Sequence, residues 1–290
     1  PIVFCLHDTT GHYWVQTAVA MASVAQHARG QCHFHVLHDD TLVPQAVQRM
    51  QALSEQLNFR LDWRAVQLPP SVLSARLRRF GPGSLFRLMI PQLFRQEEQV
   101  IYLDSDLVCN GLNLAELAIG VPALAPVAAV HDPFIAVPAR HRQALQSLGL
   151  SSEQYFNSGV MLWRPKLIEE DLIEAFDQFI AHFPDALHPD QDFLNRHFGA
   201  RAGVLDARFN TQAGLLQASL LQPVAHYQGK IVHFAGKLKP MDGSLSPGVL
   251  PFWMHAAWVP EVAACVGHAH YLYPVINKPN MLQRSKLQPV

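Results

Sequence analysis

Short apolar runs alternate with segments of helical pattern through the first two thirds of this sequence, and this alternation limits the fold more than any other feature. Short apolar runs bounded by turn residues are typical of buried strands, and the longer patterned segments between them are typical of helices. Strands that alternate with helices form a largely parallel sheet with helices on its faces. The sequence therefore predicts an α/β fold with a mostly parallel central sheet flanked by helices.

The expected elements follow this pattern along the chain. Strands are predicted at Ile2–Leu6, His33–Leu37, Asn58–Ala65, Val100–Leu103, Val127–His131, Gly159–Trp163 and Ile231–Phe234. Helices are predicted at Tyr13–Ala28, Pro44–Leu57, Ser84–Phe94, Lys166–His182 and Gln191–Phe198. Pro44 suits the first turn of a helix, whereas Pro91 is expected to bend the helix that contains it.

The character of the chain changes beyond residue 239. Seven of the 21 prolines fall between Pro240 and Pro289, so this stretch is expected to be irregular or to form short helices. We therefore predict a main domain over residues 1–240 and a Pro-rich extension, 241–290, packed on it. Lys278, Arg284 and Lys286 make the extension mildly basic, which suits weak peripheral contact with an anionic membrane surface; a merely solvated tail is the alternative.

Composition excludes several classes of protein. Charged residues make up 16% of the 290 residues and hydrophobic residues 49%, which is typical of a globular chain and not of a disordered one. A net charge of −1 provides no basic field, so no nucleic-acid partner is expected. No apolar run approaches the roughly 20 residues of a membrane-spanning helix. The four cysteines form no Cys-x-x-Cys pair and no secretion signal is evident, so a cytoplasmic location is expected.

An Asp-Ser-Asp sequence directly follows the predicted strand Val100–Leu103. Asp104 and Asp106 lie two residues apart in extended chain and therefore project to the same side, where both carboxylates can bind one Mn²⁺ or Mg²⁺. A metal held in this way is a clamp for a diphosphate. The motif alone is weak, because a second Asp-x-Asp occurs at Asp190 and Asp192 and a solvated turn or a helix cap explains either one.

His233 stands near the end of another predicted strand and is followed by Gly236 and Lys239. A histidine at a strand end can complete an Asp/Asp/His metal site, a glycine permits close backbone approach to phosphate, and a lysine supplies a positive charge for it. The alternative is an ordinary histidine of the core.

Other nucleotide-binding and hydrolytic motifs are missing. The sequence contains no Gly-x-Gly-x-x-Gly after its first strand, no Gly-x-x-x-x-Gly-Lys, no His-Glu-x-x-His and no Gly-x-Ser-x-Gly. These absences disfavour dinucleotide oxidoreductases, P-loop enzymes, zinc proteases and common serine hydrolases. Phosphate binding is therefore expected to depend on a metal.

At this point the chain resembles glycosyltransferase family 8, and within it the bacterial lipooligosaccharide and lipopolysaccharide galactosyl- and glucosyltransferases. Five motifs occur in the family's order along almost the whole chain: Val100-Ile-Tyr-Leu-Asp-Ser-Asp106, Tyr155-Phe-Asn-Ser-Gly-Val160, Asp190-Gln-Asp192, Arg208-Phe-Asn210, and His233-Phe-Ala-Gly236 with Lys239-Pro240. Together they are far more specific than any one of them.

The resemblance implies a GT-A nucleotide-sugar fold and a Mn²⁺-dependent transfer of a hexose, glucose or galactose, from a UDP-sugar to a saccharide or glycolipid acceptor with retention of configuration. It assigns the metal ligands to Asp104, Asp106 and His233, and the residues beside the reacting carbon to Asp190 and Gln191. It assigns binding of the donor to Asp8, Arg87, Asp104, Ser105, Asp132, Asn157, Ser158, Gly159, Gly236 and Lys239. Relatives carry a pair of acidic residues against uracil, whereas here His7 replaces one of the pair and Asp8 alone is left to contact the base. In a second departure, Lys239-Pro240-Met241 replaces the family's Lys-Pro-Trp.

Three further expectations concern mechanism and alternatives. Attack by the acceptor hydroxyl on the face that the UDP leaves is favoured over a covalent intermediate, because Gln191 is a poor nucleophile. The basic stretch from Arg76 to Arg87 is either a lid over the diphosphate or a solvated loop. A metal-dependent nucleotide-sugar hydrolase and a non-catalytic glycan-binding protein on the same fold stay open as alternative functions.

Overall fold

The computed structural model describes residues 1–28, 30–72, 81–135, 138–213, 222–236, 239–242 and 247–262. Its centre is a seven-stranded sheet in the order β3-β2-β1-β4-β7-β6-β8. The strands of this sheet are β1 Ile2–Leu6, β2 His33–His38, β3 Arg60–Ala65, β4 Val100–Leu103, β6 Val127–His131, β7 Phe156–Trp163 and β8 Gly203–Val204. Neighbouring strands run parallel except where β7 pairs antiparallel with β4 and β6, so the predicted α/β class with a mostly parallel sheet is confirmed.

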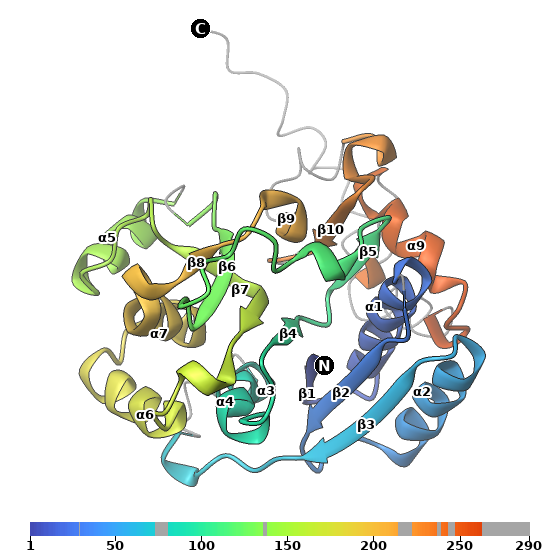
Figure 1. Cartoon of the computed structure of the whole chain (residues 1–290), viewed down its shortest axis with the longest axis horizontal. Coiled ribbons are helices and arrows are strands. Elements are labelled where there is room, and N and C mark those ends of the chain that lie inside the picture. Colours follow the sequence, from blue (N-terminus) through green and yellow to red (C-terminus); the bar gives the residue numbers. More distant parts are fainter. Residues whose placement is uncertain are drawn as a thin grey trace, which may run out of the picture.

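Helices cover both faces of the sheet (Figure 1). They are α1 Tyr13–His27, α2 Pro44–Gln56, α3 Gly83–Phe86, α4 Ile90–Leu93, α5 Ala139–Ser147, α6 Leu172–His182, α7 Pro189–Phe198 and α9 Leu250–Ala256. Alternation along the strands separates two cores. Phe4 and Leu6 of β1 pack in the core that includes residues of α1 and α2, whereas Val3 and Cys5 pack in the core that includes residues of α3, α4, α6 and α7.

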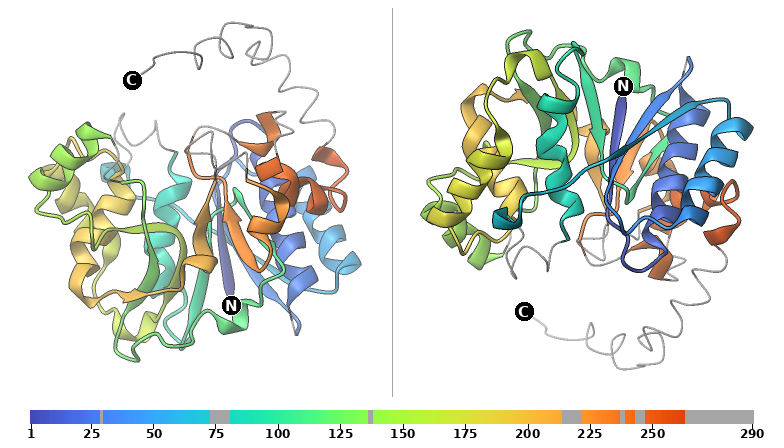
Figure 2. Two further views of the ribbon diagram at one scale, coloured as in Figure 1. Left: turned by 90° about the horizontal axis from the view of Figure 1, so that it is seen from above. Right: turned by 90° about the horizontal axis from the view of Figure 1, so that it is seen from below.

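A second, three-stranded sheet was not anticipated from the sequence. It contains β5 Leu107–Asn110, β10 Lys230–His233 and β9 Thr211–Gln212 in the order β5-β10-β9, with β10 antiparallel to β5. Helix α9 contacts β5 and α1, and the further views show α9 in red beside the blue α1 (Figure 2). This small sheet forms one wall of the candidate site.

Three predicted elements differ from the structure by three or more residues or by being divided, and the other predicted elements by at most two residues at either end. The helix predicted from Lys166 begins at Leu172, because the Asp171 side chain accepts hydrogen bonds from the first free backbone N–H groups and a separate 3₁₀ turn, Pro165–Leu167, precedes it. The strand predicted from Gly159 begins at Phe156.

The segment Ser84–Phe94 is helical but divided into α3, a 3₁₀ turn at Arg87–Met89, and α4, whose first turn contains Pro91. Helix α5 was not predicted from the sequence, because Leu145 is its only buried side chain and its apolar pattern is therefore weak.

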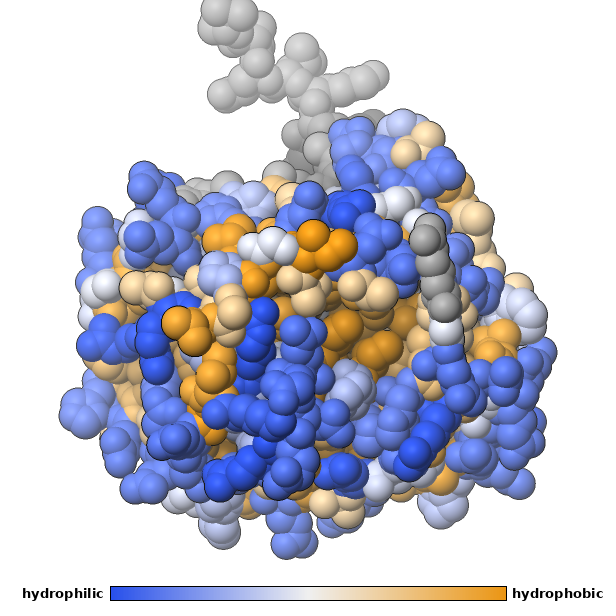
Figure 3. Space-filling view, viewed as in Figure 1, coloured by the Kyte–Doolittle hydropathy of each residue, from blue (hydrophilic) through white to orange (hydrophobic). Residues whose placement is uncertain are grey.

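Apolar side chains on the face seen in Figure 1 gather around its middle, and the rest of that face is mostly hydrophilic (Figure 3). None of the helices within the described ranges is both long enough and apolar enough to cross a membrane.

Candidate functional site

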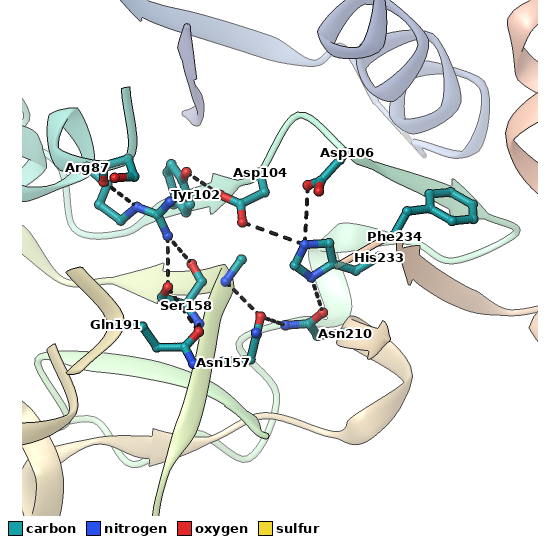
Figure 4. A network of polar contacts seen from close by, with 12 residues as sticks. Arg87, Tyr102, Asp104, Asp106, Asn157, Ser158, Gln191, Asn210, His233 and Phe234 are labelled. Carbon is teal, nitrogen blue, oxygen red and sulfur yellow. Dashed lines mark hydrogen bonds and ion pairs between the residues drawn. The ribbon is translucent and has the colours of Figure 1, made fainter. Parts of the chain in front are cut away.

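Two loops from different sheets bring Asp104, Asp106 and His233 together. Asp104 follows β4, and its backbone N–H donates to the carbonyl of Gly159 on β7. The turn then leads into β5, where Leu107 pairs with His233 of β10, so the imidazole faces the two carboxylates (Figure 4). His233 Nε2 lies 3.2 Å from Asp106 Oδ1 and 3.6 Å from Asp104 Oδ2.

The donor atoms of these three residues suit a divalent metal. One ligand atom from each residue lies within 4.8 Å of the others. Two carboxylates and an imidazole match the preferences of Mn²⁺, and carboxylates match those of Mg²⁺. Burial by itself raises the pKa of Asp106, but the ammonium of Lys239 and the imidazole of His233 hold that pKa well below its usual range. The site is therefore built to keep Asp106 ionised.

Two asparagines orient the imidazole of His233. The backbone N–H of Gly159 donates to Asn157 Oδ1 at 3.0 Å, and Asn210 Nδ2 donates to the same oxygen at 2.8 Å. Because the NH₂ group of Asn210 donates to Asn157, the Oδ1 atom of Asn210 faces His233 Nδ1 at 2.9 Å. This oxygen must accept a hydrogen bond from Nδ1–H. Nε2 then points at Asp104 and Asp106, so it is the ring nitrogen that could coordinate a metal.

Gly159 is required by this packing. A Cβ atom at residue 159 would lie 2.2 Å from His233 Cε1 and 2.8 Å from Asp104 Oδ2, and neither group is at the far end of a flexible chain. The glycine of the Tyr155–Val160 motif therefore makes room for Asp104 and His233.

Arg87 joins the metal ligands to the neighbouring strand. Its buried guanidinium donates to Asp104 Oδ1 at 3.0 Å and to the carbonyl and hydroxyl of Ser158 at 2.8 and 3.0 Å, and it lies over the ring of Tyr102. Tyr102 also donates its hydroxyl proton to Asp104 Oδ1 at 2.5 Å. Burial lowers the pKa of Arg87, but the nearby carboxylates of Asp104 and Asp190 raise it, so the guanidinium stays charged.

Gln191 is held on two sides. Its Oε1 accepts from the backbone N–H of Ser158 at 3.0 Å, and its Nε2 donates to Asp132 Oδ2 at 3.2 Å. Asp190 lies beside it, 3.6 Å from Arg87 Nη2. The second Asp-x-Asp does not present two carboxylates to one site, because Asp192 is turned into the interior, where it accepts a hydrogen bond from Tyr155 at 2.6 Å.

The Asp8 carboxylate is bonded to the residues that begin α1. Its carboxylate accepts hydrogen bonds from Thr10, His12 and the backbone N–H of Trp14 before and within the first turn of α1, and it does not line the neighbouring cleft. His7 lines that cleft instead, and its Nδ1 lies 2.6 Å from Asp39 Oδ2. The sequence pattern at the end of β1 could not distinguish the residue that caps the helix from the one that faces the cleft.

Two cavities meet at Asp104 and Asp106. A cleft of about 840 Å³ extends over the ends of β1 and β2, and a pocket of about 310 Å³ extends over β6, β7 and α7. The residues that line both of them are Arg87, Asp104 and Asp106. Ser105 lines the larger cleft and accepts a hydrogen bond from Thr17 of α1 at 2.8 Å.

Most of the remaining predicted residues line the smaller pocket. Asp132, Asn157, Ser158 and Gly236 line the smaller pocket, and Gly236 has a φ of 91°, which favours glycine. Lys239 Nζ donates to Asp106 and, at 2.7 Å, to the carbonyl of Phe234. Residues 76–80 of the stretch expected to be either a lid or a solvated loop lie outside the described residues, whereas Gly81 to Arg87 are described.

Sequence reasoning missed Gln212. This side chain is buried and lines both the 310 Å³ pocket and an adjoining groove of about 960 Å³, and neither its Oε1 nor its Nε2 has a hydrogen-bond partner. Its backbone pairs with His233 in the second sheet. Only that sheet reveals its position, since a lone glutamine after the Arg208-Phe-Asn210 motif carries no signal by itself.

Comparison with known proteins agrees with this architecture. The sequence profile described as glycosyl transferase family 8 matches residues 1–241. A lipopolysaccharide 1,3-galactosyltransferase of Salmonella typhimurium (strain LT2) is 28% identical over 232 residues, which are 71% of this chain and 63% of that protein. The lipopolysaccharide glucosyltransferase WaaO of Escherichia coli (strain K12) is 28% identical over 171 residues, 53% of this chain and 48% of that protein. The matched region thus spans less than two thirds of either relative.

Solved structures share the fold. The galactosyltransferase LgtC, crystallised with donor and acceptor sugar analogues, has a TM-score of 0.72 at 21% identity, with 88% of this chain and 95% of LgtC covered. An active-site mutant of LgtC has a TM-score of 0.74 at 21% identity, with 91% and 99% covered. The expected GT-A fold is therefore confirmed, and from the match over residues 1–241 the chain belongs to glycosyl transferase family 8.

Proposed function

We propose that this protein is a metal-dependent, retaining hexosyltransferase that moves galactose or glucose from a UDP-sugar to a hydroxyl group of a saccharide acceptor in the synthesis of lipopolysaccharide, lipooligosaccharide or another glycan. One observation carries the proposal: the Asp104–Asp106–His233 cluster stands where two cavities meet. A nucleotide-sugar is a diphosphate with a nucleoside at one end and a sugar at the other, so it fits a site whose metal ligands lie between two pockets.

The larger cleft suits the nucleoside. His7, Asp39 and Tyr13 offer polar and aromatic groups along a volume of about 840 Å³. Burial raises the pKa of Asp39, but hydrogen bonds from Thr41 and His7 lower it below its usual value, so this carboxylate is an ionised acceptor. We assign contact with the base to the His7–Asp39 pair, while Asp8 holds the shape of the loop.

The smaller pocket suits the hexose. Asp132 and Gln191 are tied to each other and to Ser158, so the polar groups that face a sugar are fixed before it binds. The two related lipopolysaccharide enzymes, one named a galactosyltransferase and the other a glucosyltransferase, support galactose or glucose as the sugar.

Charge on the departing diphosphate is balanced by several groups. A bound Mn²⁺ or Mg²⁺ supplies Lewis-acid stabilisation of the phosphate oxygens. Lys239 adds a positive charge beside Asp106, and Gly236 lets the backbone approach the phosphate closely. Arg87 holds Asp104 in place from the opposite side.

We assign retention of the sugar's configuration to attack by the acceptor hydroxyl on the face of the sugar from which the diphosphate leaves. Gln191 is an uncharged amide whose two polar atoms are engaged, and Asp190 faces the guanidinium of Arg87. Neither is a free carboxylate nucleophile of the kind that retaining glycosidases use. The departing phosphate then takes the proton of the acceptor hydroxyl.

The acceptor is assigned to the side of Gln212. A buried amide with both polar atoms unpartnered is costly unless a ligand pairs with it, and sugar hydroxyls both donate and accept. The adjoining 960 Å³ groove provides room for further sugars of a saccharide or glycolipid.

The proposed Pro-rich extension, 241–290, lies mostly outside the described residues. Its basic residues Lys278, Arg284 and Lys286, proposed as a membrane contact, all lie outside them.

The test is a transfer assay with Mn²⁺, UDP-galactose or UDP-glucose, and a panel of lipopolysaccharide core oligosaccharides. We expect an acceptor-dependent product with an α linkage, detected by mass spectrometry and NMR, and its loss in Asp106→Asn. Glu55→Gln, an exposed change on α2, is the matched control and is expected to keep activity. Sugar release at the same rate without acceptor would support the hydrolase instead, and metal-dependent UDP binding without turnover would support a non-catalytic protein.

A further inference from the structure

A second cluster of metal-binding side chains lies on the edge strands of the central sheet. His33 and His35 of β2 project from the same side of their strand, and Asp62 stands directly opposite His35 on β3. β3 is the edge of the sheet beside α2 (Figure 1). Because His33 begins β2 and the candidate active site lies beyond the other end of that strand, about 16 Å of chain separates the two.

The geometry brings three donor atoms to one point. His33 Nε2 lies 2.7 Å from Asp62 Oδ2, and His35 Nδ1 lies 3.9 Å from the same oxygen. The two imidazole rings are 4.0 Å apart, and one ligand atom from each of the three residues lies within 4.8 Å of the others. Small shifts of the side chains are enough to place all three around one ion.

His35 supplies an independent sign of a missing ligand. The residue is only 5% exposed, and its Nδ1 has no hydrogen-bond partner although it faces Asp62. A buried nitrogen without a partner is costly, and a metal would satisfy it.

The neighbouring charges permit an ion. Arg60 Nη2 lies 3.0 Å from Asp62 Oδ2, but the Arg60 side chain is 64% exposed and can move into solvent. Both His33 and Asp62 are about one third exposed, which gives an ion a path of entry.

We propose that His33, His35 and Asp62 form a second metal site that binds a divalent transition metal such as Zn²⁺ or Ni²⁺ and clamps the edge strand β3 to β2. Two of the three donors are imidazoles, which suit Zn²⁺, Ni²⁺ and Cu²⁺, whereas the Asp104–Asp106–His233 set has two carboxylates. The site stands apart from the transfer reaction and does not depend on the proposed function.

The experiment titrates Zn²⁺ into the full chain with Asp106→Asn as the background, so that the first site is weakened. We expect one equivalent of Zn²⁺ to bind and to raise the melting temperature. Adding His33→Gln or Asp62→Asn is expected to weaken that binding by more than about tenfold, since even outer-shell partners are worth that much. His182→Gln, an exposed histidine of α6, is the matched control and is expected to leave binding unchanged.

A second measurement needs no change in the cluster. With Cu²⁺ added to the background protein, the electron paramagnetic resonance spectrum is expected to show hyperfine coupling to two imidazole nitrogens. Coupling to fewer than two would overturn the proposal. The proposal also fails when the background binds no Zn²⁺, or when His33→Gln and Asp62→Asn bind it as tightly as the background.

Discussion

His233 faces Asp106 at 3.2 Å because β10 pairs antiparallel with β5 and sets Leu107 opposite the histidine. The two residues are far apart in the sequence and belong to motifs with no local connection. The register of a small second sheet therefore decides whether His233 meets the two carboxylates.

Gly159→Ala is expected to weaken binding of Mn²⁺ by at least about tenfold, because the new methyl group would displace His233 and Asp104. Overpacking of this kind also costs about 1–3 kcal/mol of stability. Isothermal titration and urea unfolding measure the two effects. Gly30→Ala is the control, since nothing lies within 4 Å of an added Cβ there, and equal Mn²⁺ affinity in both variants would contradict the geometry.

Asn210→Leu is expected to lower the affinity for Mn²⁺ by about 10- to 100-fold, because Nδ1 of His233 loses the acceptor that fixes its proton. The ¹⁵N shifts of the His233 ring, measured without metal, should change from one tautomer toward a mixture of both. An unchanged ring spectrum, in a variant that melts near the wild-type temperature, would show that Asn210 does not orient the imidazole.

Arg87→Met is expected to lower the free energy of unfolding by about 3 kcal/mol, because it leaves Asp104, the Ser158 carbonyl and the Tyr102 ring without their buried partner. Urea unfolding at pH 7 measures the loss. Arg201→Met removes an exposed arginine and should change stability by less than about 0.5 kcal/mol. Similar losses in the two variants would mean that the Arg87 network adds no stability.

Acid is expected to destabilise the fold through His255. Burial, with His27 as a second cause, lowers the pKa of His255 to about 4 from an ordinary value of 6.5. Between those values the unfolded chain binds a proton that the folded chain does not, so stability falls as the pH drops from 6.5 toward 4, by up to about 3 kcal/mol. Above pH 6.5 this contribution is fully present.

Urea unfolding at pH 7, 5.5 and 4.5 checks this expectation. His255→Gln should flatten the decline, because glutamine does not titrate, and His182→Gln should leave it as in the wild type. A decline of the same slope in all three proteins would assign the acid sensitivity to other groups.

The sequence by itself determined the parts of this protein that depend on local pattern. The alternation of strands and helices indicated the α/β class. A helix buried on one face and a strand buried on both faces each have a characteristic pattern of apolar residues along the chain. Because Asp104-Ser105-Asp106 directly follows a buried strand, its position at the end of that strand, where a loop leaves the sheet, could also be predicted from the local pattern. The family motifs added their order along the chain.

Only the tertiary structure decided which of these residues face one another. Asp104-Ser105-Asp106 and Asp190-Gln-Asp192 are alike in sequence, yet the first meets His233 while Asp192 is turned toward Tyr155. Gln212 carries no sequence signal, and its position comes from the pairing of β9 with β10. Contacts between distant segments follow from strand register and packing, and no local pattern of side chains encodes them.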